Sequence, residues 1–429
     1  MKRVLALFLV TVLAVGSVGC ASGIGTRNAI PDGKSGLSSE ELTGNTTSAD
    51  YEELPADQTF RDALNDFSFR MFRASAESAE GNFMVSPLSA VLAFSMLMNG
   101  AEGNTLTEMQ NTFFPGLDPD TVNRYLGTYM SSLTEEDAVT LNIANSIWVR
   151  DDSAFKVKEA FLKANATFYR AAVYKALFDQ STVDDVNSWV SENTDGQIPK
   201  IMEDIDPDAV MLLINAICFK GNWEEQYEDY QIGEDDFTKE DGTMVTKQML
   251  SSGESIYLSD ENTTGALKYY EGGRYAFAAL LPEEGTDLAD YISSLTTEKW
   301  NGLWESRTSD YDVSLRIPEF SGDFRVDLVK MLQDFGMNDA FDGSAADFSA
   351  LGEMENGDNI HVSDAFQMTH VELDRYGTKA AAVTVISMVC DSAMPEEKET
   401  KTVDLNRPFV YLIVDTYNGI PVFIGTVTE

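Results

Sequence analysis

The chain ends in two strand-length segments, residues 410–414 and 422–427, that are apolar at nearly every position. A strand with one solvated face alternates apolar and polar residues, so these two segments are expected to be central strands with both faces covered. Residues 88–97 are also apolar almost all round, and they follow a Ser-Pro pair that is typical of a helix start. A chain with such elements needs a large, layered fold to bury them.

The remaining periodicity is mixed. Apolar residues recur at helical spacing over 60–72, and a further helix is expected over 183–192. Strands are expected at 209–219, 275–281 and 313–317. Because helices come mostly first and strands mostly later, without strict alternation, the pattern predicts an α+β fold with large antiparallel or mixed sheets.

The first segment is expected to be a signal rather than part of the fold. A basic start and an apolar run over 4–15 are too short to span a bilayer and indicate a signal peptide, residues 1–20. A small residue precedes Cys20, which resembles a bacterial lipoprotein signal and predicts lipidation of Cys20. Cleavage nearby with free secretion is the alternative. Residues 21–56 are small and polar and predict a flexible tether, followed by one large domain, 57–429, outside the cytoplasm.

Charge excludes some partners. Asp and Glu number 71 against 30 Lys and Arg, which gives a formal net charge of −41. That field repels phosphates, so neither nucleic acid nor an anionic membrane surface is an expected partner, and membrane contact is expected only through the lipid anchor. Of the three cysteines, Cys218 is expected to be buried and Cys390 exposed, so no disulfide framework is predicted.

The common templates for catalysis do not occur in the sequence. GxSxG, GxxxxGK, GxGxxG and HExxH are all missing, and His361 and His370 are the two histidines. His370, Glu372 and Asp374 share one face of an expected strand and could bind a metal. Three polar groups on a strand face are more often a solvated surface, so no metal and no cofactor is expected. A hydrolase with unrecognised chemistry is the remaining enzymatic hypothesis.

Several short motifs occur in a fixed order over residues 60–429, and each is weak alone. They are Asn82–Ser89 with Asn99–Thr105, Leu141–Trp148, Val186–Val190 with Thr194–Ile198, Asn215–Trp223, Ile317–Phe320, Ala346–Ser349, Arg407–Phe409 and Val422–Gly425. Together they resemble the serpins. The resemblance implies three β-sheets with about nine helices and an exposed reactive loop near the C-terminus. In that family a protease attacks the loop as bait, and the cleaved loop enters the main sheet and traps the protease.

The segment from Gly377 onward matches the hinge of such a loop. Insertion buries every second side chain, so alternate positions must be small and uncharged. The hinge residues identified in this way are Gly377, Thr378, Ala380, Ala381, Ala382 and Thr384. Lys379 falls on the other face, and no proline occurs up to Met394. The pattern favours an inhibitor that is consumed in the reaction; the alternative is a non-inhibitory serpin that acts as a binding or chaperone-like module.

The family's fixed hinge length places the bait bond. Counted from Gly377 as the first residue, the fifteenth is Asp391, so the reactive bond is predicted between Asp391 and Ser392. Cleavage can also fall nearby, and the alternative bait residues are Met388, Val389 and Cys390. The expected partner is a serine or cysteine protease that is elastase-like, chymotrypsin-like or specific for Asp, and the inhibitor is expected to be a monomer.

The family's sheet-opening region is matched in part. Ser86, Ser89, Asn215 and Trp223 match, but Gln367 stands where the family usually has a histidine, so gating of the sheet by pH is not expected. Before the hinge, Arg375 and Tyr376 replace a common acidic pair. Glycosaminoglycan activation needs a basic helix, and residues 106–136 carry a single basic residue, Arg124, so no glycosaminoglycan partner is expected.

Overall fold

The computed structural model describes residues 36–44, 46–133, 139–151, 155–206, 209–354, 359–378 and 398–429. Within these residues the chain forms nine α-helices, as expected. They are α1 (Gln58–Ala76), α2 (Pro87–Met98), α3 (Gly103–Phe113), α4 (Pro119–Leu133), α5 (Glu159–Ala164), α6 (Gln180–Asn193), α7 (Leu288–Ser294), α8 (Thr297–Glu305) and α9 (Val329–Asp334).

Three large β-sheets organise the described residues, which confirms the predicted α+β architecture. In spatial order the main sheet contains β1 (Glu40–Glu41), β5 (Ala172–Ala176), β3 (Val139–Arg150), β6 (Met211–Asn222), β16 (Gly377–Thr378), β15 (Asp364–Leu373) and β13 (Phe320–Asp327). The second contains β2 (Phe83–Val85), β19 (Ile420–Val427), β18 (Phe409–Asp415), β11 (Tyr275–Pro282), β10 (Thr263–Tyr269) and β9 (Ile256–Ser259). The third contains β17 (Thr400–Asp404), β12 (Asp312–Pro318), β8 (Met244–Glu254) and β7 (Ile232–Thr238), and β14 (Gly352–Met354) pairs with β4 (Phe155–Val157).

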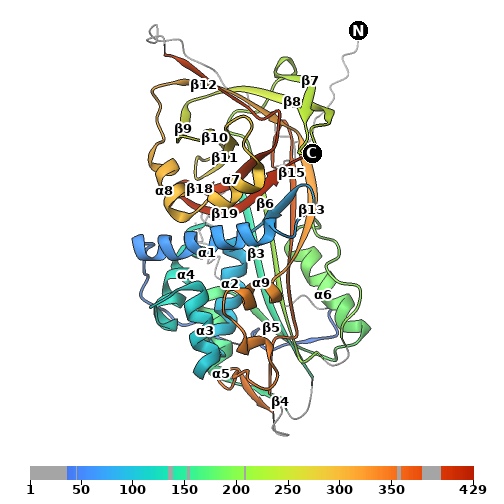
Figure 1. Cartoon of the computed structure of the whole chain (residues 1–429). Helices are drawn as coiled ribbons and strands as arrows, with labels where there is room; N and C mark the ends of the chain where they lie inside the picture. The colour runs from blue at the N-terminus through green and yellow to red at the C-terminus, as the bar shows by residue number, and fades with distance from the viewer. Residues whose placement is uncertain are drawn as a thin grey trace, which may run out of the picture.

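Helices cover both faces of the main sheet (Figure 1). On one face, α6 packs its apolar side against β3, β5 and β6 in a hydrophobic cluster that includes Trp148 and Trp189. On the other face, α2 lies between the main sheet and the second sheet, and all of its residues are buried. The strands β18 and β19 are buried at every position. The elements predicted to be covered on all sides therefore form the centre of the molecule.

The ends of α2 explain why it starts where it does. Ser86 is its N-cap, and the Ser86 hydroxyl accepts a hydrogen bond from the Ser89 amide, while Pro87 occupies the first turn where its missing N–H costs nothing. The same Ser86 hydroxyl donates to the Val422 carbonyl of β19 at 2.8 Å. The cap of α2 therefore also joins the helix to the second sheet.

The structure places part of the expected tether against the domain. Glu40 and Glu41 pair with β5 and extend the main sheet at its edge. The Asp185 carboxylate on α6 accepts hydrogen bonds from the Ser38 and Ser39 amides and from the Ser39 hydroxyl, at 2.6–3.0 Å. This segment is therefore docked by strand pairing and by a carboxylate, although its composition predicted a tether.

The described residues include no helix that is long and apolar enough to cross a membrane. Cys218 is buried within β6, as predicted, and burial raises the pKa of its thiol. Cys20 lies outside the described residues.

Candidate functional site at the opening of the main sheet

The main sheet is paired unevenly between β6 and β15. At one end the two strands form a direct parallel ladder from Asp364–Leu212 to Thr369–Ile217. At the other end β16 lies between them, antiparallel to both, and pairs with Gly221 and Asn222 of β6. Between these two regions, residues 218–220 and 370–372 form no ladder pair with each other. The sheet is thus already parted where the hinge enters.

A tight turn delivers the hinge to this opening. The Asp374 carboxylate accepts hydrogen bonds from the Tyr376 and Gly377 amides at 2.7 and 3.2 Å, and burial raises its pKa. Trp223 holds the other side of the turn: its amide donates to the Tyr376 carbonyl, and its indole N–H donates to the Asp374 carbonyl at 3.0 Å. Asp374 and Trp223 therefore position the start of the hinge.

Gly377 has no substitute at its position. A Cβ placed there would lie 2.0 Å from the Gly221 carbonyl oxygen, which is far inside van der Waals contact. Because the two backbones approach this closely, the hinge can pair with β6 only if this residue has no side chain.

Thr378 is seated in the core. It is 2% exposed, and its hydroxyl lies 2.7 Å from the Tyr270 hydroxyl. Burial raises the pKa of Tyr270, whose ring stacks on Trp223 at a centroid distance of 4.5 Å. The first inward-facing hinge position is thus already buried in this structure.

The predicted sheet-opening residues divide between two places. Gln367 Oε1 accepts a hydrogen bond from the Ser86 amide, and Gln367 Nε2 donates one to the Ser86 carbonyl, both at 2.8 Å. Asn215 contacts the Ser89 hydroxyl and donates to the Ser89 carbonyl at 2.9 Å. These four side chains form a buried polar layer where β6 and β15 pair directly, whereas Trp223 lies at the hinge.

Asn145 was missed by the sequence reasoning. It is 4% exposed, and its Oδ1 accepts a hydrogen bond from Asn215 Nδ2 at 2.5 Å, which extends the polar layer to β3. Its place becomes evident only from the ladder, because Asn145 is paired directly with Asn215. The motif around residues 141–148 contains Asn145 but does not indicate this role.

Of the three residues considered for metal binding, His370, Glu372 and Asp374, two form hydrogen bonds with other groups. His370 Nδ1 lies 2.7 Å from an Asp323 carboxylate oxygen on β13, and Asp374 is engaged in the hinge turn. The described residues contain no group of three or more His, Cys, Asp or Glu side chains suited to a metal ion.

Most of the predicted loop lies outside the described residues. Of the hinge, Gly377 and Thr378 are described. The remaining predicted hinge and bait residues lie outside the described residues: Ala380, Ala381, Ala382, Thr384, Met388, Val389, Cys390, Asp391 and Ser392.

Comparisons with known proteins agree with this architecture. Residues 62–429 match the family model Serpin (serine protease inhibitor). An uncharacterized serpin-like protein of Thermococcus kodakarensis is 27% identical, with 97% of each chain covered, and a bovine plasma serine protease inhibitor is 29% identical over 88% of this chain and 93% of its own.

Solved serpin structures also match this chain. The native state of the thermophilic serpin tengpin superposes with a TM-score of 0.85 at 37% identity, covering 91% of this chain and 99% of that one. The latent state of tengpin gives a TM-score of 0.77 at the same identity, covering 88% of this chain and 100% of that one. The family description is that of serine protease inhibitors, so the partners typical of the family are target proteases. By the family match over most of its length and by its fold, this chain belongs to the serpin family.

Proposed function

We propose that this serpin inhibits proteases by being cleaved in its loop and inserting the cleaved loop into the main sheet. The observation that carries the proposal is the seating of Gly377 and Thr378 between β6 and β15, antiparallel to both. A loop that enters here continues into the unpaired stretch without reversing direction. Its remaining residues need only displace the direct β6–β15 ladder.

If the inserted loop continues in the register observed at Gly377 and Thr378, the position of each further loop residue in the sheet follows. Gly377 pairs with Asn222 and Thr378 with Gly221, so each further loop residue would pair with one earlier residue of β6. Thr384 would then lie between Asn215 and Gln367, which now pair with each other. Small polar Thr384 would enter the buried polar layer, where its hydroxyl can hydrogen-bond to either amide.

The register also assigns the two faces. Thr378 faces the core, so even-numbered loop residues would be buried there and odd-numbered ones would face α6. Lys379 would lie opposite Lys220 and Glu372, and Glu372 is exposed. Lys220 is already paired with Asp195 at 2.9 Å, so Glu372 would be the partner of Lys379. Lys379, the charged residue of the hinge, would therefore lie opposite the carboxylate of Glu372 on the neighbouring strand β15.

Strand length limits the position of the bait bond. The strand β6 begins at Met211, which would pair with Met388 if the loop continued in the observed register. A cut before Met388 would leave part of the ladder unfilled, so the reactive bond is proposed at or after Met388. Asp391–Ser392 is the proposed bond, with Met388, Val389 and Cys390 as the alternative bait residues.

The deciding experiment is a gel. The domain is mixed with elastase, with chymotrypsin and with a protease that cleaves after Asp, and each mixture is boiled in detergent before electrophoresis. We expect a covalent complex of the summed mass with at least one of the three. Cleavage of the loop by all three without a complex would instead favour the non-inhibitory binding module.

Localisation is a separate proposal. The protein is expected to act outside the cytoplasm, held to the membrane by a lipid on Cys20 or secreted. Metabolic labelling with a radioactive fatty acid tests the anchor, with Cys20→Ala as the control variant. Label on the parent chain that is lost in the variant supports lipidation, and equal label on both refutes it.

A further inference from the structure

Three consecutive carbonyls in the turn before the hinge each accept a hydrogen bond from one of two residues. Trp223 donates from its indole N–H to the Asp374 carbonyl at 3.0 Å and from its amide to the Tyr376 carbonyl at 2.9 Å. The Tyr227 amide donates to the Arg375 carbonyl at 3.1 Å, and the Arg375 guanidinium donates to the Tyr227 carbonyl at 3.1 Å. The position of the turn therefore depends on how firmly Trp223 and Tyr227 are themselves held.

A buried cation lies against both of these side chains. Lys268 of β10 is 3% exposed, and its ammonium nitrogen lies 5.4 Å from the centre of the Trp223 ring and 4.5 Å from that of the Tyr227 ring. The same ammonium donates to the Glu254 carboxylate at 3.0 Å and to the Glu225 carbonyl at 3.2 Å. Because cation–π contacts and charged hydrogen bonds are stronger where water is excluded, Lys268 fixes the position of both rings.

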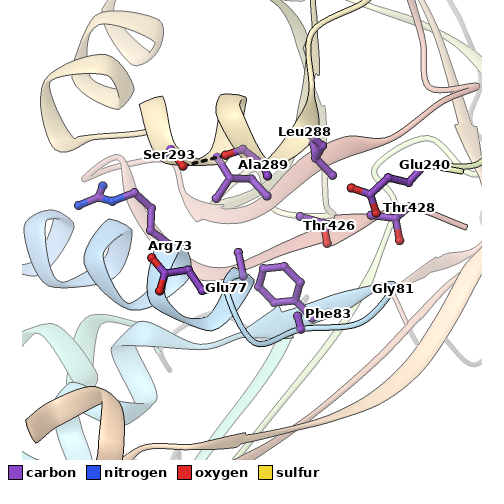
Figure 2. A pocket seen from close by; sticks show the side chains of 13 residues that line it. Arg73, Glu77, Gly81, Phe83, Glu240, Leu288, Ala289, Ser293, Thr426 and Thr428 are labelled. Carbon is purple, nitrogen blue, oxygen red and sulfur yellow. Dashed lines mark hydrogen bonds between the residues drawn. The ribbon is translucent and has the colours of Figure 1, made fainter. Parts of the chain in front are cut away.

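Glu254 connects the cation to Tyr227 by a second route. The Ser252 hydroxyl donates to the Glu254 carboxylate at 2.6 Å and lies 3.2 Å from the Tyr227 hydroxyl. Glu254 and Ser252 belong to β8 of the third sheet, Lys268 belongs to the second sheet, and Trp223 and Tyr227 follow β6 of the main sheet in the chain. One network thus joins the three sheets at the turn. The cavity of about 330 Å³ between the end of α1, α7, β2 and β19 (Figure 2) is separate, because none of these residues lines it.

We propose that Lys268 is a positioning residue for loop insertion, which holds Trp223 and Tyr227 in place and, through them, keeps the hinge turn in register with β6. This role rests on the proposed inhibitory function. A cleaved loop whose turn is not held must find the register again before it can insert, so insertion slows and hydrolysis of the acyl-enzyme gains. The bait bond is proposed at or after Met388, so the first attack of the protease does not depend on the turn.

Hydrogen exchange at the Thr378 amide tests the positioning without any protease. Lys268→Met/Glu254→Gln removes both charges of the buried pair and leaves neither unpaired. Lys299→Met/Asp260→Asn is the matched control on α8, because the Lys299 ammonium also pairs with the Asp260 carboxylate, at 3.5 Å, and lies 4.7 Å from the centre of a tyrosine ring. We expect exchange at least about tenfold faster in the first variant, through local opening of the hinge, and unchanged exchange in the control. Retained protection in the first variant, or equal acceleration in both, would overturn the proposal.

The trapping reaction gives a second readout that a merely structural role would not move. With a protease that the parent protein traps, Lys268→Met/Glu254→Gln should consume at least about twofold more inhibitor per protease inactivated, while the rate constant of the first attack stays within about twofold of the parent value. Lys268→Arg should restore the parent stoichiometry, because it keeps the cation, and a cavity of about 400 Å³ that borders Lys268 and Glu254 leaves room for the larger guanidinium. Unchanged stoichiometry in the double variant, or no rescue by Lys268→Arg, would refute the role of the cation. A parent that traps no protease refutes the proposed function instead, and the exchange comparison then still decides the positioning role.

Two variants of Tyr227 decide the question if the charge-pair variant does not fold. Tyr227→Leu removes the ring but keeps the backbone amide that binds Arg375, so exchange at the Thr378 amide should become faster than in the parent. Tyr227→Phe keeps the ring against the Lys268 ammonium, so exchange should stay at the parent rate. Equal exchange rates in the two variants would show that the contact between ring and cation does not hold the turn.

Discussion

Replacing Thr378 with Arg tests whether the loop enters the sheet at the observed register. Thr378 is 2% exposed and contacts Tyr270, and a Cβ added at its ladder partner Gly221 would already lie 2.9 Å from the Tyr270 ring. No space exists for a guanidinium at this position. The arginine must therefore either be buried without a partner or force the hinge out of the sheet.

The two outcomes differ greatly in cost. In the uncleaved protein the hinge can leave, which loses the Thr378–Tyr270 hydrogen bond and the few ladder bonds of β16, about 2–4 kcal/mol of unfolding free energy at most. During trapping the hinge must stay in the sheet, and burying an unpaired charge costs several kcal/mol. If ~3 kcal/mol of this cost is felt at the insertion barrier, insertion slows by roughly 150-fold.

Hydrolysis of the acyl-enzyme then competes with insertion. We expect Thr378→Arg to be cleaved as a substrate, with more than about ten inhibitor molecules consumed per protease inactivated. The measurement is the stoichiometry of inhibition beside the yield of detergent-stable complex. Lys379→Arg is the matched control, because in the proposed register a charge one residue later would face α6 and Glu372. If Thr378→Arg traps protease as well as Lys379→Arg does, the register derived from β16 is wrong.

Three further variants test other parts of the structure. Gly377→Ala should expel the hinge from the sheet, because the added Cβ would clash with the Gly221 carbonyl. Hydrogen exchange at the Thr378 amide should then become as fast as in an open loop. If that amide stays protected from exchange, the close approach of the two backbones is refuted. Asp185→Ala removes the acceptor of three hydrogen bonds from the N-terminal segment and should lower the unfolding free energy in urea by about 1–3 kcal/mol, while exposed Asp184→Ala should not; similar values for both would refute the docking. Asp391→Ala should abolish inhibition of an Asp-specific protease and spare inhibition of elastase, and mass spectrometry of the released fragment should find Ser392 at its start; another first residue moves the bait bond.

The fold could be predicted where a run of consecutive apolar residues shows that a segment must be buried on every side. The helix α2 and the strands β18 and β19 are apolar on every side, and a segment of this kind is stable only at the centre of a layered domain. The Ser-Pro start of α2 is equally local, since the cap and the first-turn proline lie within two residues of each other.

The parts that could not be predicted depend on distant partners. Gly377 matched a hinge, but its necessity comes from the Gly221 carbonyl, more than 150 residues away in the chain. The N-terminal segment is polar enough to be a tether, and it is held by partners far away in the chain: the Asp185 carboxylate, 146 and 147 residues further on, and the strand β5. No local pattern encodes such a contact, because serine and aspartate are also typical of exposed loops.

The melting temperature before and after loop cleavage tests the account most directly. The intact domain is nicked with a protease that it does not trap, the cut is verified between Val383 and Ser392, and both forms are compared by scanning calorimetry. With a cut at or after Met388, insertion from Thr378 to Met388 would form roughly twenty ladder hydrogen bonds at ~1 kcal/mol each in place of the shorter β6–β15 ladder. At roughly 1–2 °C per kcal/mol for a domain of this size, the nicked form should melt about 20 °C higher. An equal or lower melting temperature would mean that the cut loop stays outside the sheet.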